Sequence, residues 1–206
     1  MTLKEELQNL KDENINTIKV FFDMEFTELY QDTEIISIGC YTEAGEIFYG
    51  EITNYNKDKC SDWIKENVIN NLNYNGKEYF TRSYPNKVFI SNIKSEVARQ
   101  LREWLNSLIK TDNDEIQFIS DVCHYDFVLL IDLLCKNALY LPDYISPVCI
   151  DINPMIAYTY DITDAQAFDI TRENILKDNN IELKKIVKHN SLFDVMVISM
   201  IYKLLK

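Results

Sequence analysis

Two carboxylates close the most hydrophobic segment of the chain. Residues 17–24 are almost continuously apolar, and the segment ends in Asp23-Met-Glu25. In a β-strand, side chains two positions apart point to the same face, so Asp23 and Glu25 would lie side by side. Two such carboxylates repel each other and lose hydration, and they stay charged only beside a cation. The pair therefore predicts a cation site, whereas Asp32-Thr-Glu34, with the same spacing, lies in a polar turn typical of an exposed surface.

A second carboxylate breaks an apolar pattern near the C-terminus. Residues 192–205 have helical periodicity, and Asp194 falls on the apolar stripe of that helix. The stripe continues through Val197, Ile198, Ile201 and Leu205. A buried carboxylate on a helix indicates either a ligand for a cation or a favourable charge in the first turn of the helix.

Asp126 repeats this pattern at the start of another predicted helix. The leucines that follow it with helical spacing are Leu129, Leu130, Leu133 and Leu134. Asp121, which comes directly after a predicted strand at 115–120, competes for the same role. Both aspartates remain candidates for a third acidic position.

The chain has two histidines, and one of them is spaced for chemistry. His189 precedes Asp194 by five positions, in the loop before the last helix, so it would project from the helix end that presents that carboxylate. His124 has no such partner. A neutral imidazole there could accept a proton from water, although a loop histidine is more often a surface residue.

These positions need a sheet with helices around it. Strands are predicted at 17–24, 34–41, 46–53, 115–120 and 147–152, and helices at 58–72, 93–109, 125–137 and 192–205. The order is that of the ribonuclease H-like fold, an α/β fold whose five-stranded mixed sheet, with three antiparallel strands and then two parallel ones, is flanked by helices. A single domain is expected over 1–206, with its core at 17–206.

Taken together, the Asp-x-Glu strand, the aspartate after the fourth strand and the His-x4-Asp helix start resemble the DnaQ-like DEDDh 3′–5′ exonucleases. The opening of the chain, with Glu34-Ile-Ile-Ser-Ile-Gly39 after the acidic turn, is similar to a small bacterial 3′–5′ exoribonuclease subgroup related to ribonuclease T. That subgroup includes a polyadenylate-specific member. The segment 54–92 matches least and reads as a divergent insertion.

The resemblance implies a metal-dependent enzyme that releases nucleoside 5′-monophosphates from the 3′ ends of single-stranded RNA. It implies two Mg²⁺ or Mn²⁺ ions, with Asp23 shared between them and His189 as the general base. Glu25, Asp194 and Asp126 would complete the ligand set, Asp126 being favoured over Asp121 because the family segment ends in an aromatic residue and Asp. Met24, Phe26 and Thr27 would contact the substrate, and a homodimer like that of ribonuclease T is a further expectation.

The net charge of −12 argues against an extended nucleic-acid surface, because phosphate binding draws on lysine and arginine. A local basic patch is expected instead, from Lys94, Arg99, Arg102, Lys184, Lys185 and Lys188. Tyr79, Phe80 and Tyr84 could stack on bases, although packing in the core or in a loop is the more common role for such residues. The alternatives are a DNA 3′–5′ exonuclease with the same residues and a degenerate, non-catalytic binding module for nucleic acid or protein.

The sequence offers no signal peptide and no apolar run long enough for a membrane span, which predicts a cytoplasmic protein. The five cysteines lack the spacing of a zinc site, so free thiols are expected.

Overall fold

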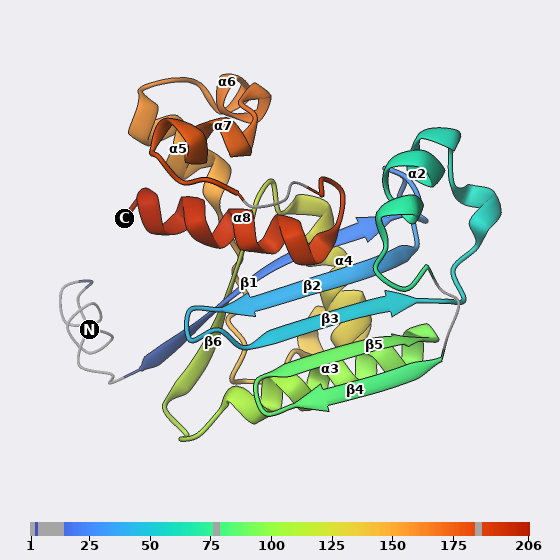
Figure 1. Cartoon of the computed structure of the whole chain (residues 1–206). Coiled ribbons are helices and arrows are strands. Elements are labelled where there is room, and N and C mark those ends of the chain that lie inside the picture. The colour runs from blue at the N-terminus through green and yellow to red at the C-terminus, as the bar shows by residue number, and fades with distance from the viewer. Residues whose placement is uncertain (1–2, 4–14, 76–78, 184–186) are drawn as a thin grey trace.

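Three antiparallel strands form the centre of the sheet (Figure 1). The computed structural model describes residues 3, 15–75, 79–183 and 187–206. The strands are β1 (Asn16–Phe26), β2 (Ile35–Thr42) and β3 (Ile47–Ile52). Residues of high β-propensity dominate all three, and β3 is buried along its whole length. The predicted meander is confirmed.

Two parallel strands extend the sheet beyond β1. They are β6 (Asp114–Ser120) and the short β7 (Ile150–Asp151). The β1–β6 pairing runs from Asn16 opposite Asp114 to Phe21 opposite Ile119. β1 continues past that point as far as Phe26, so its last residues are no longer paired with β6.

The sheet has seven strands, in the order β4-β5-β3-β2-β1-β6-β7, where the sequence predicted five. The additional strands are β4 (Phe80–Tyr84) and β5 (Lys87–Asn92), which form a hairpin, with β5 parallel to β3. The sequence of β4 did not indicate a strand because four of its five residues are exposed, so hydrophobic alternation is missing.

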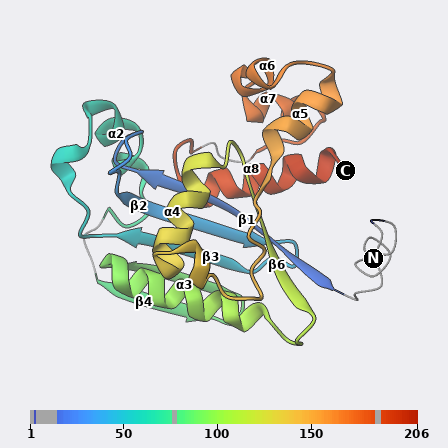
Figure 2. The ribbon, with the colours of Figure 1, turned by 180° about the vertical axis from the view of Figure 1, so that it is seen from behind.

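Helices cover both faces of the sheet. α3 (Lys94–Leu108) and α4 (His124–Cys135) lie on one face, and α8 (Ser191–Leu204) crosses the other, as the two opposite views show (Figures 1 and 2). Three short helices that the sequence did not predict stand beside α8: α5 (Ile152–Tyr160), α6 (Asp164–Asp169) and α7 (Arg172–Asp178). The predicted helix at 58–72 is broken into η1 (Lys57–Lys59), α2 (Asp62–Asn67) and η2 (Ile69–Asn71).

The sheet separates two apolar clusters. Phe22 and Phe118 pack edge to face, with ring centroids 5.3 Å apart, in the larger cluster under α3 and α4. Phe21 packs against Tyr202 of α8, at 5.4 Å, in the smaller cluster. Neighbouring residues of β1 thus point into different clusters, as strand alternation requires. In the described part of the chain, no helix has both the length and the apolar character needed to cross a membrane.

Candidate active site

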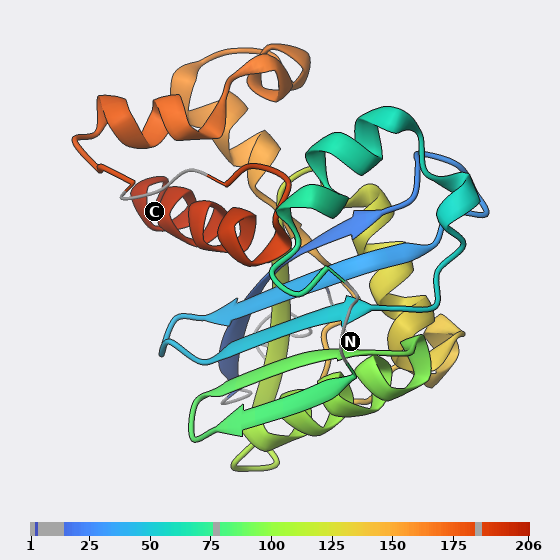
Figure 3. The same ribbon diagram turned by 45° about the vertical axis from the view of Figure 1, so that its right-hand side comes forward.

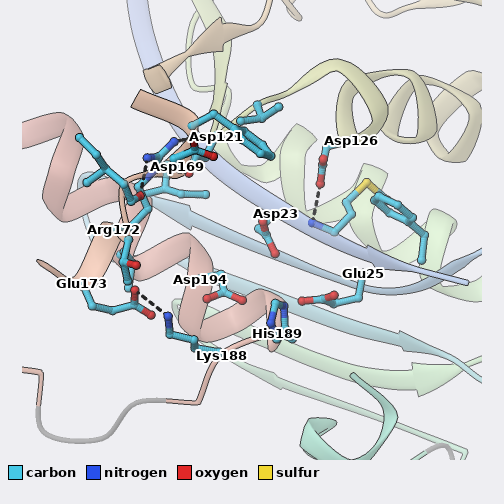
Figure 4. Close-up of a pocket in the computed structure, with 18 residues that line it drawn as sticks. Asp23, Glu25, Asp121, Asp126, Asp169, Arg172, Glu173, Lys188, His189 and Asp194 are labelled. Atoms are coloured by element: carbon cyan, nitrogen blue, oxygen red, sulfur yellow. Dashed lines mark hydrogen bonds and ion pairs between the residues drawn. The ribbon is translucent and has the colours of Figure 1, made fainter. Parts of the chain in front are cut away.

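The end of β1 presents its two carboxylates toward α8. Phe21, Asp23 and Glu25 alternate with Phe22 and Met24, whose side chains enter the cluster under α3 and α4. Asp23 and Glu25 consequently lie on the α8 face, at the floor of a cleft of about 420 Å³ (Figure 4). Both residues lie in β1 and are paired with β2, so the sheet positions both carboxylates.

The first turn of α8 brings a third carboxylate to the same place. Asn190 caps the helix by accepting the Phe193 amide N–H at 3.3 Å, and its own backbone N–H donates to Asp194 Oδ2 at 3.1 Å. Ser191 hydrogen-bonds Ser37 of β2, with the hydroxyl oxygens 3.0 Å apart. Asp194 therefore faces the cleft from a helix end that is capped and anchored to the sheet.

Asp23, Glu25 and Asp194 form one acidic cluster. Each contributes one carboxylate oxygen, and these oxygens lie within 4.8 Å of one another. Burial, followed by repulsion from the neighbouring carboxylates, raises the pKa of Asp23 and of Glu25 well above their usual values. Burial also raises the pKa of Asp194, to about 7. Among the described residues, no lysine or arginine forms an ion pair with any of the three.

Asp126 and Asp121 both line the cleft, in different surroundings. Asp126 is buried at the start of α4, where Oδ1 accepts the Met24 amide N–H at 2.9 Å and burial raises its pKa to about 7. Asp121 forms a two-pronged ion pair with Arg172, with nitrogen–oxygen distances of 2.6 and 2.8 Å. The charge of Asp121 is already balanced by Arg172, which favours Asp126 as the additional cation ligand. That role of Asp126 stays a prediction.

His189 stands at the rim of the cleft, beside the acidic cluster (Figure 4). Its backbone is in the left-handed region, with φ of 57°, and its ring meets that of Trp63 edge to face at 4.9 Å. Burial, and then the charge of Lys188, lowers the pKa of the imidazole. The ring is therefore neutral at pH 7 and can accept a proton.

Arg172 and Glu173 line the cleft as well, and the sequence singled out neither of them. Arg172 also donates to Asn153 Oδ1 of α5 and to two backbone carbonyls at the end of α6, which ties the start of α7 to both helices. Glu173 pairs with Lys188 at 3.2 Å. Pairing across the cleft wall has no local sequence signal, because Asp121 and Arg172 are 51 positions apart.

The three predicted substrate contacts lie in different environments. Phe26 lines the cleft and stacks on Tyr125, with ring centroids 6.1 Å apart. Met24 borders the cleft, but its side chain is buried in the apolar cluster. Thr27 is fully buried, and its hydroxyl accepts the Glu34 amide N–H at 3.1 Å in the β1–β2 turn. This geometry places Phe26 well for stacking and holds the Thr27 hydroxyl within the turn, and the substrate contacts of all three residues stay predictions.

The predicted basic patch is dispersed. Lys94, Arg99 and Arg102 belong to α3, on the far face of the sheet from α8 (Figure 2). Lys94 pairs with Asp132, Arg99 with two glutamates, and Arg102 with backbone carbonyls of α4. Lys184 and Lys185 lie outside the described residues, and Lys188 alone of the described members lines the cleft.

The predicted stacking aromatics are also remote. Tyr79 precedes β4, and Phe80 and Tyr84 belong to it, at the sheet edge. Strands β5, β3 and β2 lie between β4 and β1, a separation of about 19 Å at the usual strand spacing. These aromatics cannot reach a base held at Asp23.

The ribonuclease H-like fold of this chain is that of known exonucleases. The 3′-exonuclease solved for 3′-end specific recognition of the histone mRNA stem-loop superposes with a TM-score of 0.60 and 13% identity, over 98% of this chain and 69% of that protein. Pop2p of S. pombe, in its Mg²⁺- and Mn²⁺-bound form, gives a TM-score of 0.57 and 14% identity, over 97% and 87%. Cell-death related nuclease 4 gives 0.55 and 13%, over 91% and 62%.

No protein-family model matches the sequence. No curated protein matches it either. The structural similarities, at these identities, confirm the predicted fold class.

Proposed function

We propose that this protein is a metal-dependent 3′–5′ exonuclease that removes nucleoside 5′-monophosphates from single-stranded RNA. The observation that carries the proposal is the cluster of Asp23, Glu25 and Asp194, whose oxygens lie within 4.8 Å of one another at the floor of a cleft. Three carboxylates at this separation are unfavourable together unless cations join them. The exonuclease fold and the resemblance to ribonuclease T and its small bacterial relatives support the same function.

The donor set fits hard divalent cations. Asp23, Glu25, Asp194 and Asp126 would hold two Mg²⁺ or Mn²⁺ ions through oxygen alone, with Asp23 shared. Ions bound there would stabilise negative charge on the phosphate and on the leaving 3′-oxygen. The pairing of both Asp121 oxygens with Arg172 supports Asp126 over Asp121 as the fourth ligand.

Proton transfer and substrate binding are the roles of the protein's own side chains. His189, neutral because burial lowers its pKa, takes the proton of the attacking water. Phe26 supports the terminal base by stacking, and Lys188 at the rim can approach a backbone phosphate. The acidic surface is compatible with this activity because the cations supply the positive charge that phosphate requires.

RNA and DNA oligomers labelled at the 3′ or the 5′ end provide the test. With Mg²⁺ or Mn²⁺, we expect stepwise shortening of RNA from the 3′ end, and no cleavage with EDTA or in Asp23→Asn. Preferential shortening of DNA would identify a DNA exonuclease with the same site. Tight binding of oligomers without cleavage under any cation would contradict the proposal and favour a non-catalytic binding module.

A further inference from the structure

The loop that carries His189 is held by a segment that the proposed mechanism does not use. That segment comprises α2 and η2, residues 62–71, within the stretch that matches the resembled family least. Figure 3 shows it beside the start of α8, although more than a hundred positions separate the two in the sequence. We refer to residues 62–71 as the clasp.

Asn71 binds the backbone on both sides of His189. Its Nδ2 donates to the Lys188 carbonyl at 2.9 Å, and its own carbonyl accepts from Asn190 Nδ2 at 2.7 Å. His189 lies between these two bonds in the left-handed backbone region, with φ of 57°. A residue with a side chain occupies that region only where its surroundings hold it there, and the bonds from Asn71 supply such a constraint.

Trp63 fixes the imidazole itself. The two rings meet edge to face, with centroids 4.9 Å apart and planes inclined by 73°. Trp63 keeps 52% of its surface exposed, which is unusual for tryptophan unless the ring has a partner or a task at the surface. His189 makes this contact while it also lines the cleft.

The clasp is internally linked. Asn71 Nδ2 also donates to the Asn67 carbonyl at 2.6 Å, and Asn67 Nδ2 donates to the Trp63 carbonyl at 2.9 Å. These two bonds link Trp63 and Asn67 of α2 to Asn71 of η2. Through this series of bonds, the same segment contacts both the backbone beside His189 and its ring.

We propose that Trp63 and Asn71 are positioning residues for His189, a role that rests on the proposed function of His189 as the general base. Neither residue acts on the substrate. They hold the imidazole at the orientation that proton transfer requires, and a small misplacement of a catalytic group costs roughly 10²-fold in rate.

The first experiment uses NMR to monitor the environment of the His189 imidazole in the full-length, metal-free protein. The chain has two histidines, so ¹³C-histidine labelling gives two imidazole signals, and His124 serves as the internal reference. Trp63→Ala removes the ring current acting on His189 and should shift that signal alone, while Trp63→Phe should keep part of the shift. Asn71→Ala should broaden or shift the His189 signal, and Asn70→Ala, at an exposed neighbour, should leave it unchanged.

The second experiment measures cleavage with the same variants. Trp63→Ala and Asn71→Ala should lower kcat by about 10- to 100-fold with little change in KM, because positioning acts on the chemical step. Asn70→Ala should match the wild type, and Trp63→Phe should recover part of the loss. Thermal melting checks that each variant is folded.

A His189 signal that stays in place in Trp63→Ala and Asn71→Ala would overturn the proposal, and so would a shifted signal with unaltered kcat. If the wild type cleaves no nucleic acid, the proposed function fails instead, and the spectra still decide whether the clasp holds His189.

Discussion

Asp23 and Gly39 are directly paired across β1 and β2, and the glycine is what lets α8 approach the aspartate. A Cβ atom at position 39 would lie 2.2 Å from the Ser191 carbonyl oxygen, inside any permitted contact. The first turn of α8 therefore packs directly against the backbone of Gly39. This close packing lets a carboxylate oxygen of Asp194 lie within 4.8 Å of one of Asp23.

Gly39→Ala should displace the start of α8 and separate the acidic cluster. Overpacking costs typically 1–3 kcal/mol, and here the opposing atoms are backbone, which cannot rotate away. We expect a lower melting temperature together with loss of Mg²⁺ binding, measured by calorimetry. Gly50→Ala is the control, because its Cβ meets a side chain of Val97 on the other face of the sheet and should destabilise the fold without affecting cation binding.

Asp126→Asn should abolish cleavage and weaken cation binding, whereas Asp121→Asn should keep substantial activity. The side-chain amide oxygen that the first substitution leaves in place can still accept the Met24 N–H, so the fold should tolerate that change. The second substitution loosens the ion pair with Arg172 and should act mainly on stability. Cleavage assays beside melting curves separate the two effects, and the reverse order of activities would transfer the ligand role to Asp121.

His189→Ala should reduce turnover by about 10²- to 10⁴-fold while RNA binding and cation affinity change little. Wild-type kcat should rise with pH as the imidazole loses its proton. Because burial lowers the pKa of His189, the midpoint should lie below the ordinary 6.5. A pH–rate profile with saturating cation gives this midpoint, and a variant with wild-type turnover would make His189 a surface residue.

Cation binding should release protons near neutral pH. Burial raises the pKa of Asp194 and of Asp126 to about 7, so the metal-free site is partly protonated there. A cation binds the ionised form, and its affinity should therefore increase between about pH 6 and pH 8. Calorimetry in buffers of different ionisation enthalpy measures the protons released. An affinity independent of pH would mean that these carboxylates are ionised before the cation arrives.

The acidic residues could be predicted because each one violates a local pattern. Asp23 ends an apolar strand and Asp194 interrupts an apolar helical stripe, so the anomaly is visible within a few positions. The strand meander and α8 were predictable for the same reason. The structure brings Asp23, Glu25 and Asp194 together as those anomalies suggested.

The features that could not be predicted depend on contacts between segments that are distant in the sequence. In the sequence, Arg172 is an ordinary charged residue, and only the fold brings it to Asp121. Trp63 likewise reads as a surface aromatic residue, and only the fold brings it against His189. Strand β4 was not predicted because an exposed edge strand lacks the alternation that marks a half-buried one. The charge of Lys94, Arg99 and Arg102 suits phosphate binding, but α3 places these residues on the face of the sheet opposite α8.

The crowding of Asp23, Glu25 and Asp194 also means that the folded chain is less stable than its core would allow. In the unfolded chain these carboxyls ionise near pH 4, whereas in the fold their pKa values are raised, so the stability of the metal-free protein should decline as pH rises from about 4 toward 7. Asp23→Asn replaces a carboxyl that folding must either protonate or hold ionised beside its neighbours, and this change should raise the stability of the metal-free protein at neutral pH by roughly 1–3 kcal/mol. Added Mg²⁺ should reverse the ranking, because only the wild type gains binding energy. Thermal melts of both proteins with and without the cation would thus show whether Asp23 lowers the stability of the fold in exchange for cation binding and catalysis.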